Sequence, residues 1–70
     1  MLSLTERISL ARRHVATGQS IIVRQRHLIQ RARNKRLDSS VSEELLTRFE
    51  QTQIIFENDL ERLLRQQDQQ

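Results

Sequence analysis

The chain has 70 residues, a formal net charge of +3 at pH 7, a single Gly, and no Pro, Cys, Trp or Tyr. Disulfides and cysteine-based metal sites are excluded, and sheet folds are disfavoured because hairpin turns need Gly and Pro. A chain this short builds only a small core, so we expect self-association to supply stability that disulfides or metals cannot.

The first predicted helix covers about residues 4–36. Ser3 and Glu6 have the spacing of a capping box, in which each side chain accepts a hydrogen bond from the other residue's backbone amide. Gly18 is the one weak point, at a cost of roughly 1 kcal/mol relative to Ala. Seam positions recur at alternating steps of three and four: Ile8, Ala11, Val15, Gly18, Ile22, Gln25, Ile29 and Ala32.

A turn at about residues 37–40 precedes a second helix over about 41–66, and the polar tail 67–70 is expected to fray. Ser39 or Ser40 is expected to cap this helix, and Ser40 with Glu43 has the spacing of a second capping box. The second seam follows the same alternating steps: Leu46, Phe49, Gln53, Phe56, Leu60 and Leu63.

These patterns predict an all-α fold, with residues 1–70 forming a single antiparallel two-helix hairpin of the coiled-coil type. A fold-back centred on Ser39 matches the two seams and places Gln25 opposite Gln53. We interpret that amide pair as a device that fixes the register. The other facing pairs are Ala32 with Leu46, Ile29 with Phe49, Ile22 with Phe56, Gly18 with Leu60, and Val15 with Leu63. Helices exchanged between two chains would satisfy the same pattern.

Charge divides the chain into a basic half of +8 (residues 1–37) and an acidic half of −5 (residues 38–70). Antiparallel pairing is expected to bring Glu43 near Lys35, and Glu50 near Arg24 or Arg31. Each exposed pair contributes roughly 0–1 kcal/mol, so these pairs serve orientation more than stability.

The apolar surface exceeds what one hairpin covers, which predicts a homo-oligomer. We expect a homodimeric four-helix bundle, with a tetramer left open. The possible dimer face consists of Leu10, His14, Ile21, Leu28, Leu45 and Ile55. His14 is either an ordinary histidine at the edge of this face or a pH-sensitive interface group.

A basic cluster gives the alternative prediction, a small regulator that binds nucleic acid. Its possible contacts are Arg24, Arg26, Arg31, Arg33, Lys35 and Arg36. No free aromatic side chain accompanies them, so binding would rest on phosphate contacts and fall with salt.

No catalytic pattern occurs. His14 and His27 lie on different helix faces, and the chain has no Gly-rich phosphate loop and no strained nucleophile turn. We therefore expect no enzymatic activity, no cofactor and no bound metal. No apolar run approaches the roughly 20 residues of a membrane span, and the start lacks signal-peptide features, so a cytoplasmic protein without a membrane partner is expected.

The chain resembles a group of short bacterial helical-hairpin proteins with no assigned activity. The likeness spans roughly residues 12–65, and its relatives usually carry Gly where this chain has Arg36. It rests on His14, Val15, Gly18, Ile21, Arg24, Gln25, Arg26, Leu28, Ile29, Arg31, Asp38, Ser39, Leu45, Leu46, Phe49, Glu50, Thr52 and Phe56. The resemblance implies a bacterial cytoplasmic hairpin. The leading hypothesis is thus a non-catalytic interaction or adaptor protein that self-associates, with a further protein partner possible.

Overall fold

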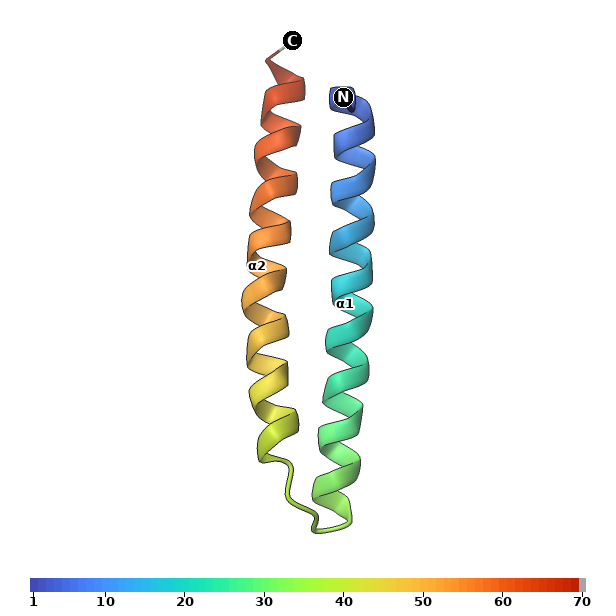
Figure 1. Cartoon of the computed structure of the whole chain (residues 1–70), viewed down its shortest axis with the longest axis vertical. Coiled ribbons are helices and arrows are strands. Elements are labelled where there is room, and N and C mark those ends of the chain that lie inside the picture. Colours follow the sequence, from blue (N-terminus) through green and yellow to red (C-terminus); the bar gives the residue numbers. More distant parts are fainter. Residues whose placement is uncertain (70) are drawn as a thin grey trace.

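A computed structural model describes residues 1–69 of the chain. Two helices, α1 (Leu4–Asn34) and α2 (Ser40–Asp68), pack side by side in opposite directions and are joined by a short turn over residues 35–39 (Figure 1). The hairpin forms within one chain and measures 54 × 19 × 14 Å. The prediction of an all-α, two-helix hairpin is therefore confirmed.

The start of α1 is fixed by the expected capping box. The Glu6 backbone amide donates to Ser3 Oγ, and the Ser3 amide donates to Glu6 Oε1, both at 3.1 Å. These bonds favour the ionised carboxylate, so the backbone hydrogen bond from Ser3, followed by the Ser3 side chain, lowers the pKa of Glu6 from its ordinary value.

The end of α1 comes two residues earlier than expected, at Asn34. The Leu37 amide donates to the Ala32 carbonyl at 2.8 Å, and the Arg36 amide donates to the Arg33 carbonyl at 3.0 Å. These two bonds form the Schellman motif, in which the residue directly after the helix C-cap adopts a left-handed conformation. Arg36 adopts that conformation with φ 58°, a position that glycine usually occupies.

The start of α2 is capped differently from expectation. The Ser40 amide donates to Asp38 Oδ1 at 2.9 Å, while the Ser39 hydroxyl donates to Glu43 Oε2 at 3.1 Å. The predicted capping box of Ser40 with Glu43 is wrong, because α2 begins at Ser40 and its N-cap is Ser39. Ser39 has φ −110° and ψ 9°, outside the extended conformation that aims a cap hydroxyl at the first amides.

The C-terminal end of α2 also differs from the expected frayed tail. The helix continues through Gln67 to Asp68, and the Gln69 amide donates to the Arg65 carbonyl at 3.2 Å. Gln70, the last residue of the predicted tail, lies outside the described residues.

The register of the two helices differs from the predicted one by a heptad. Gln53 lies against Gly18 instead of Gln25. Near the termini, Leu63 clusters with Ile8 and Ala11, where Val15 was expected. Because α1 ends earlier than predicted, the chain folds back closer to the C-terminal end of α1 than expected. Seam positions repeat every seven residues, so the pairing of the helices moves by a whole heptad. This register also covers Ile8 and Ala11, which would otherwise face the polar tail of α2.

The core of the hairpin is thin. Its buried apolar side chains are Ile8, Ala11, Ile22, Ile29 and Leu63. Among the described residues, no large side chain falls below 2% exposure. The neighbouring leucines Leu4, Leu60 and Leu64 are only partly covered. A two-helix hairpin therefore buries one side of each helix and leaves much apolar surface uncovered.

Candidate functional site

The seam between α1 and α2 contains the side chains that the heptad pattern singled out, and each of them is buried or half-buried. These residues are Ile8, Ala11, Val15, Gly18, Ile22, Gln25, Ile29, Ala32, Leu46, Phe49, Gln53, Phe56, Leu60 and Leu63. Burial along one stripe of each helix divides the rest of the surface into two faces, one on each side of the seam.

Two glutamines within the seam make separate contacts with backbone groups. Gln53, 6% exposed, donates from Nε2 to the Val15 carbonyl at 2.9 Å, and Gln25, 8% exposed, donates to the Ser42 carbonyl at 2.9 Å. The predicted amide pair between these glutamines is wrong, because the heptad shift places them in different layers. The sequence offered one signal for the true register: Ile8 and Ala11 lacked apolar partners in the predicted pairing.

One face carries ion pairs between the two helices, and we call it the ion-paired face. Arg26 contacts Glu50 at 3.2 Å, and Arg33 contacts Glu43. The hydrogen bond from Arg33, followed by that from Ser39, lowers the pKa of Glu43 from its ordinary value. The predicted partners of these acids, Lys35 for Glu43 and Arg24 or Arg31 for Glu50, are wrong. The observed partners lie two residues away from Lys35 and Arg24, on the other side of the seam.

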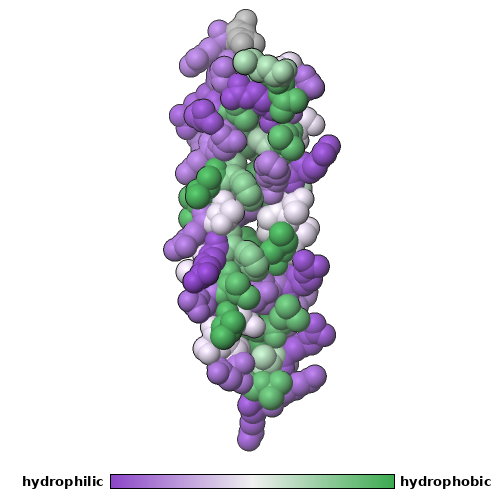
Figure 2. All heavy atoms as spheres, viewed as in Figure 1, coloured by the Kyte–Doolittle hydropathy of each residue, from purple (hydrophilic) through white to green (hydrophobic). Residues whose placement is uncertain are grey.

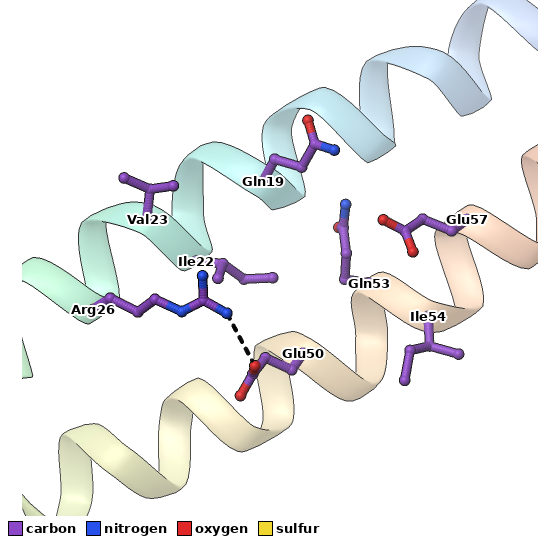
Figure 3. A pocket seen from close by; sticks show the side chains of 8 residues that line it. All are labelled: Gln19, Ile22, Val23, Arg26, Glu50, Gln53, Ile54 and Glu57. Carbon is purple, nitrogen blue, oxygen red and sulfur yellow. Dashed lines mark hydrogen bonds and ion pairs between the residues drawn. The ribbon is translucent and has the colours of Figure 1, made fainter.

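The ion-paired face also holds a shallow groove of about 360 Å³. Its lining residues come from both helices, and Gln53 points between them, while Val23 and Ile54 lie at its margins (Figure 3). Its eight lining residues are Gln19, Ile22, Val23, Arg26, Glu50, Gln53, Ile54 and Glu57. This face therefore places two exposed apolar side chains, Val23 and Ile54, beside an Arg–Glu pair.

The opposite side is the apolar face, which we define by the six predicted dimer-face residues. Each of them directly precedes a seam residue in the sequence, whereas Arg26 and Glu50 directly follow one. In an antiparallel pair, positions that precede the seam on both helices share one side. The six residues are Leu10, His14, Ile21, Leu28, Leu45 and Ile55.

Five of these six side chains are exposed, and only Ile21 is half-buried. The His14 ring contacts the Phe56 ring across the helix pair, with ring centroids 5.2 Å apart. Side chains of α1 and α2 therefore meet on this face. Figure 2 shows apolar side chains along the length of one face of the hairpin, over both helices, interrupted in places by hydrophilic ones.

The six basic residues considered for nucleic acid fall into two groups. Arg26 and Arg33 are paired with acids of α2. Within residues 1–69, no ion pair engages the other four, which are Arg24, Arg31, Lys35 and Arg36. The acids of α2 that were expected beside Arg24, Arg31 and Lys35 therefore pair with Arg26 and Arg33 instead.

Two further features are absent from the described part of the chain. No cluster of three or more His, Cys, Asp or Glu side chains there has a geometry that would hold a metal ion. Neither α1 nor α2, over residues 1–69, contains a stretch long and apolar enough to cross a membrane.

Comparison of the chain with family models, with curated proteins and with solved structures gave no match. The resemblance to short bacterial hairpin proteins therefore stays a prediction, and function is argued from the surface alone.

Proposed function

We propose that this protein is a non-catalytic helical interaction module that pairs with a second copy of itself through the apolar face, giving a homodimeric four-helix bundle. The observation that carries the proposal is the exposure of an apolar stripe contributed by both helices beside a thin core. Small helical chains without disulfides or metals commonly gain stability by association.

The exposed apolar side chains of this face suit an interface. Leu10, Leu28, Leu45 and Ile55 keep 38–65% of their surface exposed in a single chain. Apolar side chains that gather on one exposed face of a soluble protein mark an interaction site. A second copy brings an identical face, and such self-complementary pairing is the commonest symmetry of homo-oligomers.

Sedimentation equilibrium at micromolar concentration tests the proposal. The expected mass is twice the 8.4 kDa of one chain. Leu28→Lys, on the apolar face, is expected to shift the protein to the monomer. Val23→Lys makes an equally large change at an exposed apolar position beside the ion-paired groove, and it should leave the dimer intact. A helical monomer for the unmodified chain would overturn the proposal.

One observation favours a second candidate function, binding of nucleic acid. Four cationic groups in the second half of α1 and in the turn keep no acidic partner among residues 1–69: Arg24, Arg31, Lys35 and Arg36. Unpaired cations are available to phosphates, and such binding weakens steeply as salt rises from about 50 to 200 mM.

Fluorescence anisotropy with labelled duplex DNA and RNA tests this second candidate. Replacing Arg24 and Arg31 together with Gln is expected to weaken binding at 50 mM salt. The control replaces Arg12 and Arg13 with Gln, which removes the same charge from the opposite end of α1. Equal losses in both double variants would indicate unspecific attraction, and the absence of any binding by the unmodified chain at 50 mM salt would exclude this function.

A further inference from the structure

The apolar face is asymmetric, because α1 forms one lengthwise half of it and α2 forms the other half. Two copies that stack these faces about a two-fold axis can do so in two ways. An axis along the helices places α1 of each copy over α2 of the other, with both turns at one end. An axis across the helices places α1 over α1, with the turns at opposite ends.

Charge separates the two arrangements. The chain carries +8 over residues 1–37 and −5 over residues 38–70, so α1 on α1 brings two basic helices together, whereas α1 on α2 brings opposite charges together. Complementary potentials favour the second pairing, and like charges across an interface are costly.

The arginines at the margin of the apolar face strengthen this argument. On α1, Arg24 and Arg31 follow Leu10 at heptad multiples and form no ion pair within residues 1–69. On α2, the arginines at its margin are already compensated, since Arg48 pairs with Glu44 at 3.4 Å and Arg62 pairs with Asp59. Stacking α1 over α1 places these two arginines against another basic helix, whereas stacking α1 over α2 places them against an acidic one.

The level of the acids along the hairpin points the same way. Arg33 contacts Glu43 and Arg26 contacts Glu50, so α1 between these arginines runs alongside α2 between these acids. With both turns at one end, the second copy's α2 lies at the same levels. Arg31 then lies at the level of Glu44 of the second copy, whose side chain is 65% exposed although it pairs with Arg48 of its own chain.

We propose that two copies of this chain pair through the apolar face with α1 of each over α2 of the other, so that both turns lie at the same end of the four-helix bundle. This inference rests on the proposed self-association and specifies its geometry. A single nitroxide label tests it readily, because the natural chain contains no cysteine.

Electron–electron distances are measured on Leu37→Cys, in the turn, and separately on Thr5→Cys, near the start of α1, each labelled and diluted with unlabelled protein. Both positions are exposed. The proposal predicts label separations below about 30 Å in both dimers, because neighbouring bundle helices pack about 10 Å apart. Stacking with turns at opposite ends predicts separations near the 54 Å hairpin length in both dimers.

A third result identifies helices exchanged between chains. In that assembly the turns meet at the centre, so Leu37→Cys labels are close while Thr5→Cys labels lie far apart. Either that result, or long distances for both labels, would overturn the proposed arrangement but would still be consistent with a dimer. A monomeric mass in sedimentation, with no dipolar signal, would instead remove the self-association on which it depends.

Discussion

The amide oxygen of Gln53 occupies the space that a side chain at position 18 would need: a Cβ built on Gly18 lies 1.8 Å from Gln53 Oε1. The oxygen has no conventional hydrogen-bond donor among residues 1–69, and it faces the Cα of Gly18. The nitrogen of the same amide bonds to the Val15 carbonyl. The single glycine of the chain thus stands in mid-helix because a buried glutamine crosses the seam at that level.

Gly18→Ala is therefore expected to destabilise the protein by about 1 kcal/mol, although Ala favours helix by roughly that amount. The added methyl group displaces Gln53, and a lost hydrogen bond with an unsatisfied buried group costs about 1–3 kcal/mol. In a Gln53→Ala background the same change should stabilise the protein. Urea unfolding of the four variants measures this reversal of sign.

Ala16→Gly provides the control for Gly18→Ala, because residue 16 is exposed on the same helix. It should lose roughly 1 kcal/mol with either residue at position 53. A stabilising effect of Gly18→Ala in the natural background would show that Gln53 does not occupy this space.

Arg36→Gly is expected to stabilise the hairpin by about 1 kcal/mol, because a left-handed conformation costs a side-chain-bearing residue roughly 1–2 kcal/mol. Thermal or urea unfolding measures the gain. Lys35→Gly, one residue earlier with φ −91°, should give no such gain and serves as the control. If both glycines act alike, the Schellman turn is not the cause.

Gln25→Ala and Gln53→Ala test the register. Each glutamine bonds to a different backbone carbonyl, so each variant should lose about 1–3 kcal/mol. Since the two amides lie in separate layers, their losses should add within about 0.5 kcal/mol. A coupling energy above that, measured by the double-mutant cycle, would indicate that the amides contact one another.

Acid is expected to destabilise the hairpin. Hydrogen bonds from Ser3, Ser40 and Arg33 lower the pKa values of Glu6, Asp38 and Glu43, respectively, below the ordinary 4.5, 3.8 and 4.5. A carboxyl whose pKa is lower in the folded state contributes stability above its unfolded pKa, and loses it as pH falls through the folded pKa.

The unfolding midpoint, followed at fixed protein concentration from pH 7 to pH 2, should therefore decrease below about pH 4.5. Glu43→Gln should reduce that decrease, because it removes one of the three titrating groups. A midpoint that rises on acidification would contradict the capping and ion-pair geometry.

Heptad spacing was enough to predict both helices and the antiparallel hairpin, because an apolar stripe must be buried whatever its exact partner. Ser3 and Glu6 were likewise predictable, since a capping box depends only on local spacing. Register depended on where α1 ends, and the end was hard to predict because Arg36 occupies the left-handed position that glycine usually marks. The shift of one heptad then changed the partners of Gln25 and Gln53 together.

The ion pairs were predicted wrongly because the cations were assigned to the wrong side of the seam. Arg26 and Arg33 follow seam residues and so reach the acids, while Arg24 lies on the other margin. By contrast, Leu28 and Ile55 were recognisable from the sequence, because their position beside the seam is independent of which heptads face each other.

Adjacent isoleucines provide the most direct measurement of the central claim. Ile54 (57% exposed) directly follows seam residue Gln53 on the ion-paired face, whereas Ile55 (65% exposed) directly precedes Phe56 on the apolar face. Ile54→Lys and Ile55→Lys have identical composition and charge. By sedimentation equilibrium, with helicity followed by circular dichroism, the account predicts a dimer for Ile54→Lys and a monomer for Ile55→Lys. Equal association of both variants, or dissociation of Ile54→Lys alone, would contradict it.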